Sequence, residues 1–456
     1  MSRRLALEVL QRVETGARAK DAFAKLQSGR GIEARDLDLA REIVQGVLRH
    51  RGSLDALIAT RAKRAVGEMD AAVRNVLRIG LYQMTFLDRV PRHAAVHTAV
   101  ELARSARRPQ AAGFVNAVLR KLGDVCGAPL PGDGDDTPRR TLPRGDGTHV
   151  PLAQDVFPDP AADLAGHLAA RWSHPRWMVE RLLAQRGLDE VRQILAAGIA
   201  RPPISLRPAE GRRKDLTEAL TARGIAFEEE ERCVLVRGVG RVEDLPGFEE
   251  NWFAVQDATA AEVVAALEPT KASRILELCA APGGKTIALS EAVGPDGAVL
   301  AVDMPGERTE RLRAELFRRG ITNVAVLEAD ATDAASLPTG VAGRGKPGFH
   351  FALLDAPCSN TGVLARRVEA RWRIEGPQEI ANLAALQGRL LRVAADKLRR
   401  GGRVVYSTCS LDKDENEGVV AAFLTESPDY RLASQTTHLP VAGRRDGGYI
   451  AVLTRA

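Results

Sequence analysis

The chain is short of cysteine, of aromatic residues and of long apolar stretches, and these shortages exclude classes of protein. Five cysteines occur in 456 residues, without a C-x-x-C pair or a Cys/His zinc spacing, so neither a disulfide framework nor a structural metal is expected. No apolar run reaches the roughly 18 residues that a membrane-spanning helix needs. Glu8 and Arg12 stand where a signal peptide would be uniformly apolar. The sequence predicts a cytoplasmic protein with no metal and no membrane contact.

Apolar and charged side chains are abundant, at 45% and 27% of all residues. This composition supports folded domains, and the length suggests two to four of them. The net charge of +6 is uneven: residues 1–123 hold 23 Lys and Arg against 12 Asp and Glu, and the remainder holds 42 against 47. A basic module of this kind is typical of proteins that meet polyanions, although an Arg-rich soluble surface gives the same count.

Hydrophobic spacing divides the first half of the chain into three parts. Apolar residues recur at three- and four-residue steps through residues 1–123, which predicts an all-helical domain of six or so helices. Residues 124–160 hold five Gly and seven Pro without apolar periodicity, and we interpret them as a linker or disordered loop. Helical and then short strand-like segments over 161–255 predict a small α/β linking subdomain.

Residues 256–456 alternate between helical segments and near-continuous apolar strands. This alternation is typical of an α/β, Rossmann-like domain with a parallel, doubly wound sheet. The expected strands are 274–278, 298–303, 324–330, 351–357 and 403–408.

The first of these strands runs into a glycine-containing turn, which begins at Cys279 and leads into a helix. Such a turn lets a ligand approach the backbone at a helix N-terminus. A Walker A loop would need Gly at the position of Cys279, and a dinucleotide-binding turn would need G-x-G-x-x-G. S-adenosyl-L-methionine remains, because it needs close backbone approach and an acid for the ribose hydroxyls, but no pyrophosphate cradle.

Acidic residues end the next two strands. Asp303 lies 19 residues after Gly284, where a ribose-binding acid belongs, and Asp330 is expected to face the adenine end of the pocket. A single Asp at a strand end is as often a helix cap or a turn residue. Acids at successive strand ends make the binding interpretation stronger.

Both Cys358, three residues after Asp355, and Cys409 follow expected strands, at the edge where open α/β sheets bind ligands. A lone Cys is usually a small buried hydrophobe, but two at adjacent strand ends indicate chemistry. Carbon 5 of cytosine becomes nucleophilic when a thiolate adds to carbon 6. A nearby carboxylic acid would stabilise that adduct, and a base must later remove the carbon 5 proton.

The segments ELCAAPGGKT, LDAPCSNTG and YSTCSLDKDENEGVV closely resemble the signature segments of RNA (cytosine-5)-methyltransferases of the Sun/NOL1/NOP2 group. The segments RNVLRIGLYQM, VPRHAAVHTAVELA and FVNAVLRKL resemble the NusB-type RNA-binding helical domain. Their combination is similar to the members of the group that modify small-subunit (16S) ribosomal RNA. The resemblance covers nearly the whole chain except the linker, and it implies S-adenosyl-L-methionine as cofactor and ribosomal RNA as partner.

The resemblance also implies roles for single residues. It assigns the nucleophile to Cys409 and resolution of the adduct to Cys358, with Asp355 near the cytosine. Glu277 departs from the pattern, since the family commonly has Asp there. The implied cofactor contacts are Cys279, Ala280, Ala281, Pro282, Gly283, Gly284, Lys285, Asp303, Asp330 and Asp355.

Candidate RNA contacts lie in two places, downstream of Cys358 and in the helical domain. The first segment could hold phosphates or stack on a nucleotide, although a solvated helix face with a packed Trp explains it equally well. His93 and His97, four residues apart, are interpreted as helix-surface residues. The candidates are Arg366, Arg367, Arg371, Trp372 and Arg373 in the first place, and Arg74, Arg78, Arg92 and Arg120 in the second.

Two rival functions stay open. A non-catalytic RNA-binding or antitermination factor would use only the helical domain, and the two cysteines and the glycine turn argue against it. An NAD-dependent oxidoreductase is disfavoured by the absence of G-x-G-x-x-G. An enzyme is therefore the favoured interpretation, and we expect it to be a monomer. The sequence does not specify which cytosine is modified, nor whether the substrate is free RNA or a ribosomal particle.

Overall fold

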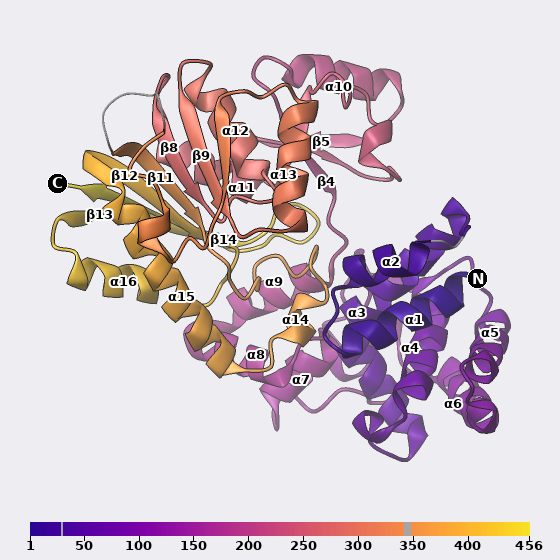
Figure 1. The fold of residues 1–456 in the computed structure, drawn as a ribbon. Coiled ribbons are helices and arrows are strands. Elements are labelled where there is room, and N and C mark those ends of the chain that lie inside the picture. The colour runs from indigo at the N-terminus through magenta and orange to yellow at the C-terminus, as the bar shows by residue number, and fades with distance from the viewer. Residues whose placement is uncertain (29–30, 342–347) are drawn as a thin grey trace. The chain divides into compact units, whose positions relative to one another are not determined.

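The computed structural model describes residues 1–28, 31–341 and 348–456, which form two compact units (Figure 1). The first unit comprises Met1–Arg201 and Leu364–Glu375, and the second comprises Pro202–Val363 and Gly376–Ala456. No helix within the described ranges has both the length and the hydropathy that a membrane crossing requires.

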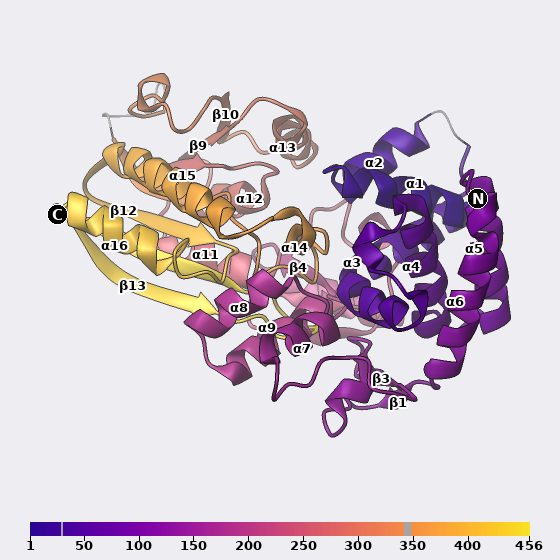
Figure 2. The same cartoon turned by 90° about the horizontal axis from the view of Figure 1, so that it is seen from below.

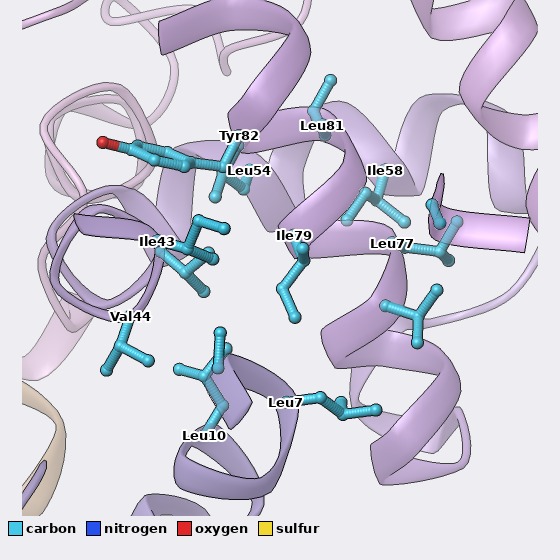
Figure 3. Packing of buried hydrophobic residues seen from close by; sticks show 14 of the residues in the cluster. Leu7, Leu10, Ile43, Val44, Leu54, Ile58, Leu77, Ile79, Leu81 and Tyr82 are labelled. Carbon is cyan, nitrogen blue, oxygen red and sulfur yellow. The ribbon is translucent and has the colours of Figure 1, made fainter. Parts of the chain in front are cut away.

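The first unit starts with the expected helical domain. Leu7, Leu10, Ile43 and Ile79 come from three different helices and point toward one another in its core (Figure 3). Burial of each such side chain contributes about 1.5–3 kcal/mol. In the described part of residues 1–125 the six α-helices are α1 (Ser2–Glu14), α2 (Ala19–Gln27), α3 (Ala34–Ala62), α4 (Ala71–Phe86), α5 (Arg92–Ser105) and α6 (Ala112–Val125).

Residues 124–160 are ordered, so the prediction of a structureless linker was wrong. Three short strands form an antiparallel sheet in the order β1-β3-β2, and Leu142 and Val150 pack into the core of the helices. Arg144 is buried and donates to Asp88 at 2.9 Å. Strands of two to four residues are too short to reveal a periodicity, which explains the error. They are β1 (Leu130–Pro131), β2 (Thr141–Pro143) and β3 (Thr148–Pro151).

The region predicted as one linking subdomain, 161–255, is divided between the two units at Arg201 and Pro202. Its helices α7 (Leu164–Arg171), α8 (Arg176–Gln185) and α9 (Leu188–Ile199) belong to the first unit. Its strands form an antiparallel sheet in the second unit, in the order β5-β6-β4-β7, with one helix. These elements are β4 (Ile204–Pro208), α10 (Arg213–Ala222), β5 (Phe227–Glu229), β6 (Val234–Val236) and β7 (Phe253–Val255).

The second unit is built on a seven-stranded sheet with the order β10-β9-β8-β11-β12-β14-β13. All five expected strands are present, and they are mutually parallel. The expectation of an entirely parallel sheet was wrong, because the chain ends in a hairpin whose strand β14 pairs antiparallel with β12. The strands are β8 (Arg274–Leu278), β9 (Ala298–Asp303), β10 (Val324–Glu328), β11 (Phe349–Asp355), β12 (Leu398–Thr408), β13 (Tyr430–His438) and β14 (Gly448–Arg455).

Helices cover both faces of this sheet, as in a doubly wound fold. α11 (Ala258–Leu267), α12 (Gly284–Val293) and α13 (Glu307–Arg318) pack on one face. α15 (Pro377–Asp396) and α16 (Glu417–Glu426) pack on the other, where Figure 2 shows them lying along the strands. The remaining helical segments are α14 (Ala370–Arg373) and the 3-10 turns Val66–Glu68, Pro109–Ala111, Pro138–Arg140, Val242–Asp244 and Ala334–Ser336.

Candidate functional site

The glycine turn connects β8 to α12 and leaves its backbone accessible. Gly283 has a φ of 105°, and a Cβ there would lie 2.5 Å from the Leu312 side chain, so both backbone conformation and space require glycine. A Cβ built on Gly284 meets nothing within 4 Å. The first turn of α12 therefore faces open space, as a ligand-binding helix N-terminus requires.

Asp303, at the end of β9, fixes this turn. Its carboxylate accepts hydrogen bonds from the backbone N–H groups of Ala281 and Met304, each at 2.8 Å. Arg308 lies 3.7 Å away and also donates to the carbonyl oxygen of Ala281. Asp303 is thus adjacent to the turn, as predicted for a residue that shares its ligand.

Asp330 is exposed beyond the end of β10. Its carboxylate accepts from the N–H of Thr332 at 2.8 Å and from the Thr332 hydroxyl at 2.7 Å. These bonds lower the pKa of Asp330. The Asp330 side chain stabilises a local turn through these bonds. Its role toward a cofactor stays a prediction.

Lys285 and Asp355 join the glycine turn to the strand that precedes the first cysteine. Their side chains form an ion pair at 2.6 Å, and Ser407 donates to the other Asp355 oxygen at 3.1 Å. Burial alone would lower the pKa of Lys285, but Asp355 outweighs this effect and raises it. Asp355 is therefore held by a lysine that stays charged.

The two predicted cysteines lie side by side at the carboxyl ends of adjacent strands. The Sγ atoms of Cys358, after β11, and Cys409, after β12, are 3.2 Å apart. Cys409 also lies 3.3 Å from the side-chain oxygen of Asn360. Space beside the Cys358 loop requires glycine at Gly362, because a Cβ there would lie 2.6 Å from the carbonyl oxygen of Gly447 and 3.0 Å from that of Cys409. The hydrogen bond with Cys409 and burial raise the pKa of Cys358.

Sequence reasoning missed Glu415, which is buried and ties the two cysteine loops together. It accepts from the backbone N–H of Ser359 at 2.9 Å and from the Ser410 hydroxyl at 2.6 Å. Gln387 donates to it at 2.9 Å. Ser359 and Ser410 directly follow the two cysteines, so one carboxylate fixes both loops. The available signal was Glu415 itself, one of four acidic residues within YSTCSLDKDENEGVV.

A second buried carboxyl lies at the glycine turn. Glu277, in β8, is 1% exposed, and its Oε2 atom has no hydrogen-bond partner among the described residues. Burial raises the pKa of Glu277 to about 8, despite the opposing effects of the neighbouring Thr286 hydroxyl and of the Lys285 charge. Cys279 is also largely buried, and its pKa is raised to about 12. Loss of the Cys279 proton is therefore disfavoured near neutral pH.

The basic segment downstream of Cys358 belongs to the first unit. Arg371 is fully buried and donates to the carbonyl oxygens of Ser173, Gly198 and Leu364 at 2.6–3.1 Å. Trp372 donates its indole N–H to the carbonyl oxygen of Leu48 at 2.7 Å. These two residues are therefore unsuited to hold phosphates or to stack on a base. Arg367 and Arg373 are exposed, and Arg366 is half-buried.

Most arginines proposed for RNA contact in the helical domain are engaged within the fold. Arg78 is buried and pairs with Glu14 at 2.8 Å and Asp55 at 2.6 Å. Arg74 also pairs with Glu14, at 3.0 Å. Because these two arginines are buried or paired, they are unsuited to RNA contact. The net charge of residues 1–123 counts them all the same, so it could not separate them from arginines that are available to RNA. Arg92 donates to the backbone carbonyl oxygens that follow α6. Only Arg120 of the four is exposed and makes neither a hydrogen bond nor an ion pair among the described residues.

Among the described residues, no group of three or more His, Cys, Asp or Glu side chains is arranged to hold a metal ion.

Three sequence families match the chain. Residues 264–449 match the family described as 16S rRNA methyltransferase RsmB/F, and residues 1–124 match the NusB family. Residues 174–237 match the ferredoxin-like domain of RsmF/B-like methyltransferases.

Curated relatives match over nearly the full length. A probable ribosomal RNA small subunit methyltransferase B from Synechocystis sp. is 30% identical over 100% of this chain and 99% of its own. Ribosomal RNA small subunit methyltransferase B from Klebsiella pneumoniae is 32% identical, over 99% and 98%. The protein of that name from Salmonella arizonae is 33% identical, over 99% and 97%.

Solved structures share the fold. The crystal structure of PH0851 covers 99% of this chain and 98% of its own at 23% identity, with a TM-score of 0.75. A methyltransferase homolog protein from Pyrococcus horikoshii covers 64% of this chain and 99% of its own, also at 23% identity, with a TM-score of 0.55. At these identities the likeness establishes the architecture alone.

Proposed function

Because this chain belongs to the 16S rRNA methyltransferase RsmB/F family, we propose that it transfers a methyl group from S-adenosyl-L-methionine to carbon 5 of a cytosine in 16S ribosomal RNA. Methyl transfer to ribosomal RNA is the activity in the names of its relatives. The choice of carbon 5, and of a covalent route to it, rests on the chemistry of the cysteines.

The residues at the glycine turn fit the cofactor. Gly284 faces open space, and Asp303 ends the neighbouring strand, where an acid binds ribose hydroxyls. The buried Glu277 Oε2 and Thr286 Oγ1 atoms have no partner among the described residues, and they are acceptors of the kind that an amino group needs. When bound, S-adenosyl-L-methionine supplies an electrophilic methyl group on a positively charged sulfur.

Cys409 is the proposed nucleophile. Its sulfur forms a bond to carbon 6 of the cytosine, and the displaced electron pair makes carbon 5 able to accept the methyl group. The carbon 5 proton then leaves to a base, the bond between sulfur and carbon 6 breaks, and the Cys409 thiolate is regenerated. The raised pKa of Cys358 supports this choice, because a thiol that keeps its proton is a poor nucleophile.

Asp355 and Cys358 assist the proposed nucleophile. Lys285 and Ser407 fix the Asp355 carboxyl group, and its proposed role is to interact with the polar edge of the cytosine and stabilise the adduct. Cys358 is the proposed partner in release of the product. The observation that carries the proposal is the 3.2 Å separation of two sulfurs beside a fixed carboxylate.

Single substitutions separate the two cysteines. Cys409→Ser should abolish methyl transfer to 16S RNA, whereas Cys358→Ser should methylate and then stay attached to RNA, seen as a denaturation-resistant band. Cys126→Ala, which removes a buried thiol outside the site, is the matched control and should transfer normally. Swapped phenotypes would make Cys358 the nucleophile, and bisulfite sequencing without a new mark would exclude carbon 5.

A further inference from the structure

A groove on the helical domain combines an apolar floor with a charged rim. It lies between α5 and α6, beside α4, and has a volume of about 630 Å³. The apolar side chains that line it are Met84, Val96, Val100 and Leu119. The polar residues of the rim include both cations and the carboxylates Glu101 and Asp124.

Two of the rim cations are already engaged. Arg92 donates to backbone carbonyl oxygens, including that of Gly123 at 2.9 Å, and Arg104 pairs with Glu101 at 2.5 Å. The other basic residues of the rim are free to bind a ligand. The side chains of His93, His97 and Arg120 are exposed and make no hydrogen bond or ion pair within the described part of the chain.

An unpaired nucleotide matches this combination better than an acidic peptide does. A nucleobase has an apolar face for the floor and for the imidazole rings, and its phosphate carries one charge for Arg120. Asn116 adds an amide at the rim that can pair with a base edge. A run of carboxylates would bring no apolar face and would meet Glu101 and Asp124.

We propose that this groove between α5 and α6 binds an unpaired nucleotide of the RNA substrate. The inference rests on the proposed function, in which RNA is the substrate. It identifies the part of the helical domain that binds this RNA. It also gives the helical domain an RNA contact that does not need Arg74 and Arg78, which are engaged within the fold. The unengaged side chains of His93, His97 and Arg120 line one apolar groove instead.

The test measures binding of the full-length protein to a fluorescein-labelled single-stranded fragment of 16S RNA by anisotropy. The double variant His97→Ala/Arg120→Ala should bind about tenfold more weakly, and the slope of affinity against salt should fall by about 1. Asn116→Trp fills the groove without changing its charge and should weaken binding similarly. Arg35→Ala removes an equally exposed cation from α3, outside the groove, and should bind like the unchanged protein.

Three outcomes would overturn the inference. An equal loss in Arg35→Ala would show that only total charge matters, and unchanged binding by both groove variants would place the RNA elsewhere. Displacement of the RNA from the unchanged protein by polyglutamate, but not by unlabelled RNA, would assign the groove to acidic peptides. Melting curves confirm that each variant is folded.

A parallel assay separates this inference from the proposed function. Transfer of labelled methyl groups to 16S RNA is measured with the same preparations. If the unchanged protein binds RNA through the groove but transfers no methyl group, the proposed function is wrong and the inference about the groove holds. If the groove variants methylate RNA with unchanged kcat/KM, the inference about the groove is wrong and the proposed function holds.

Discussion

The buried charged side chains of the two units differ in sign. In the described part of the first unit they are all arginines, and in that of the second unit carboxylates predominate. The buried arginines are Arg49, Arg78, Arg144, Arg171 and Arg371. The buried charged residues of the second unit are Glu277, Asp303, Asp412, Glu415 and Asp446, together with Lys397.

Backbone chemistry accounts for the difference. Helix C-termini leave carbonyl oxygens unpaired, and a guanidinium group has five N–H donors. Arg371 accordingly donates to Gly198, in the last turn of α9. The strand-to-helix turns of the second unit expose N–H groups instead, and Asp303 accepts two of them. The backbone groups that each architecture leaves unpaired therefore favour one sign of buried charge. A buried cation of the helical unit stabilises the fold and is not available to bind RNA.

The largest effect is expected when a buried cation of the first unit is removed. Arg78→Met leaves Glu14 and Asp55 without their shared partner, and it should lower the free energy of unfolding by about 3 kcal/mol. Urea denaturation measures this loss. RNA affinity of the folded variant should stay within about twofold of the unchanged protein, because Arg78 is a structural residue. A stable variant that has lost RNA affinity would contradict the comparison.

The matching change in the second unit should affect turnover. Glu415→Ala removes the acceptor that fixes the loops of Cys358 and Cys409, and it should lower kcat about 100-fold, or about 2.7 kcal/mol, with little change in KM for S-adenosyl-L-methionine. Glu426→Ala, which removes an exposed carboxylate from the end of α16, is the control and should leave kcat unchanged. A rise in KM with constant kcat would instead indicate a cofactor contact.

How far the sequence predicted these features depends on the range of the interactions. Five strands and the pairing of Cys358 with Cys409 followed from local pattern, because parallel strands bring their carboxyl ends to one edge. The sheet in residues 124–160 was missed because its strands are only two to four residues long. The antiparallel end of the large sheet was missed because it depends on the pairing of β14 with β12, which is distant in sequence. Distance in sequence also hid the role of Glu415, whose partner Gln387 lies 28 residues away.

A pH-dependent effect is expected at Glu277. The folded protein retains the proton up to about pH 8, and the unfolded chain loses it near pH 4.5. Stability due to the neutral carboxyl is therefore complete below about pH 4.5 and is lost as the pH rises to about 8. Glu277→Gln is neutral throughout, so its stability relative to the unchanged protein should rise by about 2 kcal/mol between pH 5 and pH 6.5.

Denaturation of both proteins at the two pH values, without cofactor, checks this prediction. Glu310→Gln changes an exposed carboxylate of α13 and serves as the control. It should show no gain that depends on pH. A constant difference between Glu277→Gln and the unchanged protein at both pH values would mean that Glu277 is ionised in the folded state.

The smallest loss of stability is expected at an exposed ion pair of the first unit, and it can be compared with the loss at the buried Arg78. Arg108 and Asp70 pair at 3.0 Å with both side chains 40% exposed, so Arg108→Ala should cost less than about 1 kcal/mol. Asp70 also caps α4 by accepting from the N–H groups of Ala72 and Val73, and Asp70→Ala should cost about 1 kcal/mol more. Equal costs in urea denaturation would show that the ion pair matters more than the cap. A cost at Arg108 equal to that at Arg78 would remove the distinction between buried and exposed arginines on which the comparison depends.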